Sequence, residues 1–240
     1  MKEKDLPIDR TKHKVYSKNA KKCVQKLLHR YYDEKIAVKL WEKVQLQYCE
    51  YLKDEPALKD MKITASIYDP ILIFAWYAVV PDKPPLEEVQ QDIYQSFFGS
   101  FDLMGKVFDL NRRPDNRLAS KIFKKANDIR VREIKMFPES FRMGSSSYDK
   151  GNGIIRYSFT QCPNAEFARR HHMEDVLPVF CNCDHLAMQA IHAALIREGT
   201  CATSNCCDYC IVGDKSPIAE QYKLVTAKNG LLISVRNESG

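Results

Sequence analysis

The segment IIRYSFTQ, residues 154–161, decides the fold class of this chain of 240 residues. Ile155, Tyr157 and Phe159 alternate with polar residues, and this period of two is typical of a strand with one buried face. The segment CCDYCIV, residues 206–212, repeats the alternation and puts Cys207 and Tyr209 on one face. Two such segments in the second half of the chain predict a small antiparallel sheet.

The rest of the apolar pattern is helical. In the first half, apolar residues recur every three or four positions, which is the period of a helix with one buried face. Two further helices are predicted over residues 164–173 and 184–195. The predicted fold class is therefore α+β: a helical N-terminal half packed on a small antiparallel sheet, with two helices in the C-terminal half. The residues of the first-half pattern include Val24, Leu27, Leu28, Leu40, Val44, Leu118 and Ile122.

Three regions are predicted along the chain. Residues 1–143 form a mainly helical region. The segment GSSSYDKGNG, residues 144–153, is rich in Gly and Ser and predicts a flexible connector. Residues 154–240 form a Cys-rich α+β region, and the regions could also make one integrated domain.

Composition and charge exclude several classes of protein. The net charge is +6, and residues 1–43 hold 13 Lys and Arg against 6 Asp and Glu. No nucleic-acid motif accompanies this charge, so we expect a solvated basic surface and no nucleic-acid binding. The longest apolar run, residues 71–80, is ten residues long, about half of what a membrane span requires. The charged N-terminal segment predicts no export signal, hence a cytoplasmic protein with reduced thiols.

The nine cysteines allow three interpretations. Disulfides are the weakest, because the count is odd and close pairs have poor geometry for separate bridges. A structural zinc site is the second, because paired cysteines are typical zinc ligands. Its ligands would be Cys181, Cys183, Cys207 and Cys210. The third interpretation is a pocket that does chemistry on a small molecule.

Several residues suit such chemistry. Cys181 and Asp184 lie three apart at a predicted helix start, where backbone N–H groups lower the pKa of a thiol. Cys207 and Asp208 are adjacent in a predicted strand and so point to opposite faces. His185 follows Asp184 on the helix and is either a binding residue or a packed core histidine.

The order of these motifs resembles the L-2-amino-thiazoline-4-carboxylic acid hydrolase family. The similarity runs through YSFTQCP (157–163), MEDVLPVFCNCDH (173–185), IREGT (196–200) and CDY (207–209), and covers about residues 150–213. Members of that family have a strand ending in Cys-Pro, a Cys-x-x-Asp, an Arg-x-x-Thr and a Cys-Asp-aromatic motif. These motifs correspond to Cys162, to Cys181 with Asp184, to Arg197 with Thr200, and to Cys207 with Asp208. The family's usual Gly before Cys-Asp is replaced here by Ala202–Asn205, and Cys201 is not a family position.

The resemblance implies a hydrolase that opens a small cyclic amidine, 2-aminothiazoline-4-carboxylate, to N-carbamoyl-cysteine. Asp184 or Asp208 would hold the amidinium and Arg197 the substrate carboxylate, with Thr200, Cys162 and His185 lining the pocket. We favour Cys207 as the nucleophile, so that Cys207→Ser would lose turnover and keep its fold; Cys181 and water activated by a carboxylate remain alternatives. No cofactor is implied, and no oligomeric state. Two alternatives are a non-catalytic small-molecule-binding or sensor module, and an interaction domain stabilised by zinc.

Overall fold

The computed structural model describes residues 2–62 and 67–237. The chain divides into two compact units, Met1–Phe97 and Phe98–Gly240. The order of elements confirms the predicted α+β class, with helices mainly in the first half and antiparallel sheets in the second. The boundary between the units lies after Phe97, well before the predicted end of the helical region at residue 143.

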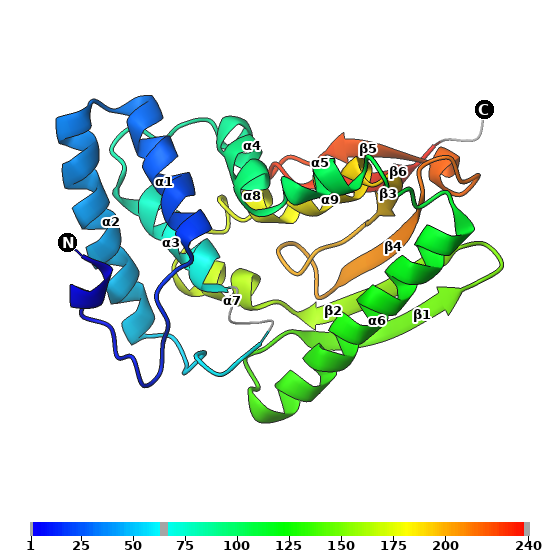
Figure 1. Cartoon of the computed structure of the whole chain (residues 1–240), viewed down its shortest axis with the longest axis horizontal. Coiled ribbons are helices and arrows are strands. Elements are labelled where there is room, and N and C mark those ends of the chain that lie inside the picture. Colours follow the sequence, from blue (N-terminus) through cyan, green and yellow to red (C-terminus); the bar gives the residue numbers. More distant parts are fainter. Residues whose placement is uncertain (1, 63–66, 238–240) are drawn as a thin grey trace. The chain divides into compact units, whose positions relative to one another are not determined.

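The first unit is helical (Figure 1). Side chains at the helix starts act as caps: Ser17 accepts a hydrogen bond from the backbone N–H of Ala20, and Asp33 accepts one from Ile36. The apolar run 71–80 forms most of α3, where every side chain from Ile71 to Trp76 has 0% exposure. The run is therefore part of the core of this unit. The elements are η1 (Glu3–Asp5), α1 (Lys18–Tyr31), α2 (Glu34–Lys53), α3 (Tyr68–Val79) and α4 (Leu86–Phe97).

The second unit is built on a four-stranded antiparallel sheet of order β1-β2-β4-β3 and a two-stranded sheet β5-β6. Both predicted strand segments are confirmed, as β2 and β4. The helices of this unit are α5 (Ser100–Met104), α6 (Arg113–Met136), α7 (Pro163–Arg170), α8 (Pro178–Cys181) and α9 (Cys183–Ala190). The strands are β1 (Arg142–Asp149), β2 (Ile154–Gln161), β3 (Ala193–Ile196), β4 (Cys207–Gly213), β5 (Tyr222–Thr226) and β6 (Leu232–Arg236), with η3 (Ala219–Gln221) before β5.

The segment predicted as a flexible connector is instead a β-hairpin. β1 pairs antiparallel with β2, and the turn that joins them is fixed by Asp149, which accepts backbone hydrogen bonds from Gly151 and Asn152. Gly153 has φ of +66°, a conformation that glycine adopts without strain. The prediction failed because backbone pairing with β2 needs no apolar side chains in the partner strand, so a Ser-rich segment can join the edge of the sheet.

The predicted helix over 184–195 is too long at its C-terminal end. Helix α9 ends at Ala190, and His192 then adopts a left-handed φ of +58°. This residue turns the chain into β3, whose four residues pair with β4. The apolar sequence of Ala193–Ile196 fits a helix and a buried strand equally well, so its period alone could not decide.

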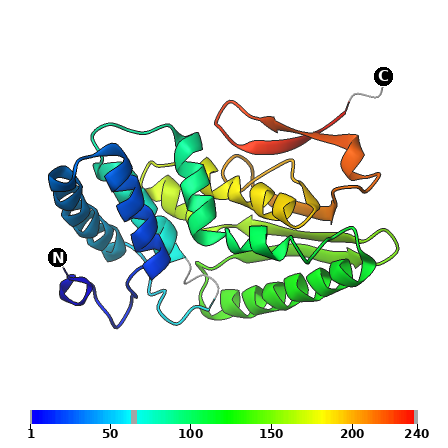
Figure 2. The ribbon, with the colours of Figure 1, turned by 45° about the horizontal axis from the view of Figure 1, so that its top comes forward.

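Helix α6 lies along β1 and β2 in both views (Figures 1 and 2). Phe123 stacks on Tyr157 at 5.6 Å between ring centroids, and the Arg130 guanidinium lies 5.1 Å from the centroid of Phe159. Leu118 and Ile122, from the helical pattern of the sequence, are 51% and 58% exposed. The helix is where the pattern predicts it, but aromatic and cationic side chains face the sheet.

The two faces of the sheet have different surroundings. Tyr157 of β2 stacks on Tyr209 of β4 on the face that α6 covers. On the opposite face, Ile154, Ile196 and Val212 form a buried cluster against which Cys210 packs. The site described next lies on the face that carries Tyr209.

Candidate functional site

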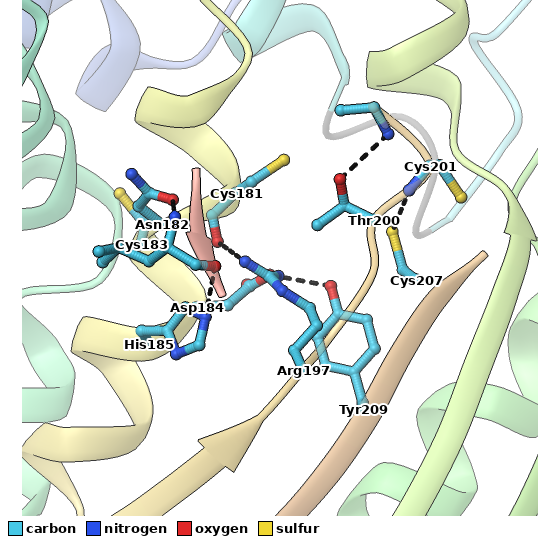
Figure 3. A network of polar contacts seen from close by, with 12 residues as sticks. Cys181, Asn182, Cys183, Asp184, His185, Arg197, Thr200, Cys201, Cys207 and Tyr209 are labelled. Atoms are coloured by element: carbon cyan, nitrogen blue, oxygen red, sulfur yellow. Dashed lines mark hydrogen bonds and ion pairs between the residues drawn. The ribbon is translucent and has the colours of Figure 1, made fainter. Parts of the chain in front are cut away.

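An ion pair between Asp184 and Arg197 forms the centre of the site (Figure 3). Asp184 lies in the first turn of α9, and Arg197 directly follows β3. The Asp184 Oδ2 atom accepts hydrogen bonds from the Arg197 guanidinium at 3.0 Å and from the Tyr209 hydroxyl at 2.8 Å. Segments far apart in the sequence therefore meet at one carboxylate oxygen. We call Asp184, Arg197 and Tyr209 the ionic centre.

Arg197 is fully enclosed, with 0% exposure, whereas the Asp184 side chain is 34% exposed. The guanidinium also donates to the Cys181 backbone carbonyl at 2.9 Å and lies 5.6 Å from the centroid of the Tyr209 ring. Burial opposes its charge, but Tyr209 and Asp184 outweigh this and raise the pKa of Arg197. Within the described part of the chain, its Nε–H has no acceptor, although it is buried. An unpaired buried donor is costly, so this N–H can bind an acceptor that enters the site.

Tyr209 is held as a hydrogen-bond donor. Its ring stacks on Tyr157 with 4.6 Å between the centroids and an angle of 11° between the planes. Burial, followed by the charge of Asp184, raises the pKa of Tyr209 well above its usual range. The hydroxyl therefore keeps its proton and can orient the carboxylate of Asp184.

A second group, which we call the thiol group, consists of Cys162, Cys181, Cys201 and Cys207, all free cysteines. The electrostatic surroundings of Cys162, Cys181 and Cys207 each include other thiols of the group. The backbone N–H of Cys201 donates to the Cys207 sulfur at 3.0 Å, as Figure 3 shows. Burial raises the pKa of both Cys162 and Cys181 to about 12, which keeps these two thiols protonated.

Cys201 differs from the other three thiols. The interaction with the Cys207 thiol, and to a smaller extent the charge of Arg169, lowers the pKa of Cys201 to about 7. The same interaction, with burial, raises the pKa of Cys207. The hydrogen bonds of the two thiols also differ: the Cys201 thiol donates to the Phe159 carbonyl at 3.4 Å, whereas the Cys207 sulfur accepts the Cys201 backbone N–H. A surface hollow of about 330 Å³ is lined by Cys201, Arg169 and the loop as far as Asn205.

Three residues predicted for the site make hydrogen bonds to the backbone instead of contacts within the ionic centre or the thiol group: Asp208, Thr200 and His185. Asp208 accepts backbone hydrogen bonds from Glu198 and Gly199 at 3.2 and 2.7 Å, on the strand face opposite to Cys207. Thr200 is fully buried and accepts a hydrogen bond from Ala202, so it shapes the loop before β4.

His185 is buried, and its Nε2 lies 3.1 Å from the Leu232 carbonyl of β6. Burial lowers the pKa of His185 to about 3. A neutral imidazole held by backbone is typical of a core histidine. The structure therefore brings Asp184, Arg197, Cys162, Cys181 and Cys207 together, and connects Asp208, Thr200 and His185 to the surrounding framework.

The four cysteines of the zinc interpretation are not brought together. Cys207 and Cys210 are three apart in β4 and point to opposite faces of the strand, with Cys210 packed against the cluster of Ile154 and Val212. The thiol of Cys183 donates to the Val179 carbonyl. Among residues 2–62 and 67–237, no group of three or more His, Cys, Asp or Glu side chains is arranged to hold a metal ion.

Sequence reasoning missed two features of the site. Alternation placed Tyr209 on the same face as Cys207, but no role was predicted for its hydroxyl, which donates to Asp184. Cys201 was set aside because it is not a family position. Cys201 lies six residues before Cys207 in the sequence, with a loop between them, and this short separation could have predicted their contact.

The convergence of these motifs agrees with a comparison to known families. The sequence profile of the L-2-amino-thiazoline-4-carboxylic acid hydrolase family matches residues 62–211, more than half of the chain. The chain belongs to this family. The match begins at residue 62, well before the motifs that start at residue 157. The similarity to the family therefore also includes helices α3 to α6. No curated protein and no solved structure matches the chain significantly. None of the helices in the described residues is both long and apolar enough for a membrane span.

Proposed function

We propose that this chain hydrolyses 2-aminothiazoline-4-carboxylate, or a close cyclic amidine, to N-carbamoyl-cysteine, and so acts in cysteine metabolism. The observation that carries the proposal is the ionic centre, in which Asp184, Arg197 and Tyr209 meet from separate family motifs. Family membership supplies the reaction class. The chemistry of the site supplies the assignment of residues.

The substrate is complementary in charge to the ionic centre. It carries a cationic amidine and an anionic carboxylate, while the centre presents an anion beside a cation. Both hydrogen bonds to Asp184 fall on Oδ2, and a third of the side chain is exposed, which leaves Oδ1 to accept an amidinium N–H. In this proposal the substrate carboxylate pairs with Arg197, whose Nε–H has no acceptor among the described residues; because the side chain has 0% exposure, binding must first open a path to it.

The thiol group supplies the nucleophile in this proposal. Cys201 ionises near pH 7, and the Cys207 thiol that interacts with it can return a proton. The Cys201 thiolate adds to C2 of the ring. The ring C–S bond then breaks, and the released sulfur takes a proton to become the thiol of the product. This leaves an isothiourea attached to Cys201.

Water completes the reaction. It adds to the same carbon, the bond to Cys201 breaks, and Cys201 leaves as a thiolate. Substrate and one water together give N-carbamoyl-cysteine, with no oxidant or reductant. Asp184 stabilises the protonated form of the amidine in both steps, and the protonated amidine is more electrophilic at C2 than the neutral one.

The test is product formation. Purified, reduced protein is incubated with L-2-aminothiazoline-4-carboxylate, and N-carbamoyl-cysteine is followed by mass spectrometry, because the protein's own thiols interfere with colour reactions. A product rate proportional to protein concentration and absent from a heat-denatured control is the expected result. Absence of product from this substrate would overturn the proposed reaction and favour a binding module on the same fold.

A further inference from the structure

A groove of about 730 Å³ lies between α6 and β1, within the range of typical ligand sites. Its walls are mainly apolar and include Phe123, Val131, Met143, Tyr148 and Ile155. Val131 is 43% exposed, although it is an apolar residue on a long charged helix. None of these side chains has a part in the proposed hydrolysis, so the groove needs a separate explanation.

The groove is long. Its α6 wall extends from Arg117 to Val131, which at a rise of 1.5 Å per residue is about 21 Å. A wall of this length is long enough for an extended hydrocarbon chain that lies along the helix.

One end of the groove is basic. A second hollow of about 400 Å³ shares Arg117, Tyr148 and Lys150 with the groove and is lined further on by Arg113 and Lys215. Among the described residues that line this second hollow, none is acidic. Its four cations, all exposed, form no ion pair within the described part of the chain. The positive end of the α6 dipole adds to their field.

Acidic residues do occur nearby, but they are engaged. Asn111, which lines the second hollow, donates to Asp109 and Asp214. Asp128 lies in the apolar groove and is paired with Lys124 at 2.7 Å. Among the described residues that line the two hollows, Asp128 is the only acidic one, so cations outnumber carboxylates along the lining.

We propose that the two hollows form one binding site for a single-chain amphipathic anion, with its hydrocarbon chain in the groove and its carboxylate or phosphate head at Arg117 and Lys150. Burial of the chain against Phe123 and Val131 supplies the hydrophobic contribution to binding. The free cations hold the head group. This site is separate from the ionic centre and does not depend on the proposed hydrolysis.

An added peptide strand is a poorer occupant. β1 is the edge strand of the sheet, but its pairing with β2 is irregular between Arg142 and Ser146. Such bulges disturb the regular backbone spacing that strand addition requires.

Isothermal titration calorimetry with the full chain tests the proposal. The probes are dodecanoate and dodecyl phosphate below their micelle concentrations, with 1-dodecanol and dodecyltrimethylammonium as controls for the head group. We expect one site per chain for at least one anion, and at least tenfold weaker binding of both controls. No binding of either anion overturns the proposal, as does equal affinity for dodecanol. Binding only to anionic vesicles, and not to monomeric anions, would replace it with a membrane surface.

Variants locate the site. Val131→Asp in the groove and Arg117→Glu/Lys150→Glu at the basic end should each weaken binding at least tenfold. Their matched controls are Leu118→Asp, an exposed apolar residue of the same helix outside the groove, and Lys125→Glu/Lys39→Glu on exposed helix surfaces. These should stay within twofold of the unmodified chain. Equal loss in control and test variants would show that binding lies elsewhere.

Discussion

Replacing Asp184 with asparagine keeps the shape of the side chain and removes the negative charge beside Arg197. The guanidinium, with 0% exposure, is then left without its counter-ion. At the observed N–O distance of 3.0 Å, Coulomb's law with an effective dielectric constant of 20 gives about 5 kcal/mol for the pair. Because the Asp184 side chain is 34% exposed, solvent screens part of this attraction.

We therefore expect Asp184→Asn to lower the free energy of unfolding by about 2–3 kcal/mol, slightly below the usual cost of breaking a fully buried pair. The assay is urea unfolding at pH 7.5, followed by far-ultraviolet circular dichroism. Tyr209→Phe, which removes one neutral donor to the same oxygen, should cost about 1 kcal/mol. Asp128→Asn is the matched control, because it breaks the exposed Lys124–Asp128 pair, and should cost about 0.5 kcal/mol or less.

A second substitution separates the ion pair from the shape of the site. In the Asp184→Asn/Arg197→Met double variant, no charge is left unpaired, so its loss should be smaller than the sum of the two single losses. If Asp184→Asn costs no more than Asp128→Asn, or if the two single losses simply add, the reasoning that makes Arg197 dependent on Asp184 is refuted.

Three further predictions follow from the thiols and from His185. Cys201→Ser should abolish turnover, and Cys207→Ser should reduce it at pH 7 with partial recovery at higher pH; equal rates for all three proteins would exclude Cys201 and Cys207 as the nucleophile. In the unmodified chain, kcat/KM should rise with pH through about 7, the pKa expected for Cys201. Arg169→Gln should move the midpoint of this rise to higher pH, because it removes a positive charge near the thiol. An unchanged profile would show that Arg169 does not affect the ionisation of the thiol. Because burial lowers the pKa of His185 to about 3, the unfolded chain binds a proton below about pH 6.5 that the folded chain does not. The free energy of unfolding should therefore fall by about 1.4 kcal/mol per pH unit below this point, and His185→Gln should flatten that slope in urea titrations.

The spacing of apolar residues along the sequence predicted much of the fold. The strands β2 and β4 were predicted because buried and exposed side chains alternate along them, and the sequence displays this alternation directly. The hairpin strand β1 was missed because its Ser-rich residues are held by backbone bonds to β2. The end of α9 was missed because a left-handed His192 leaves no signal in the apolar pattern.

The candidate site was predicted in part. Family motifs identified Asp184, Arg197 and Cys207 as neighbours, and alternation along β4 correctly separated Asp208 from Cys207. What motifs could not supply was the environment of each group. The interaction that shifts ionisation from Cys207 to Cys201 depends on the loop between them, and the enclosure of His185 depends on β6.

The most direct test of the account compares turnover of 2-aminothiazoline-4-carboxylate by the unmodified chain, Asp184→Asn and Asp128→Asn. Initial rates of N-carbamoyl-cysteine formation are measured by mass spectrometry in urea-free buffer at pH 7.5. Circular dichroism first confirms that each protein is folded. We predict that Asp184→Asn lowers kcat/KM by about 100-fold or more, as expected for loss of a charged group at the reacting amidine, while Asp128→Asn keeps the rate of the unmodified chain. Turnover by Asp184→Asn at the unmodified rate would contradict the account, because the ionic centre would then have no part in the reaction.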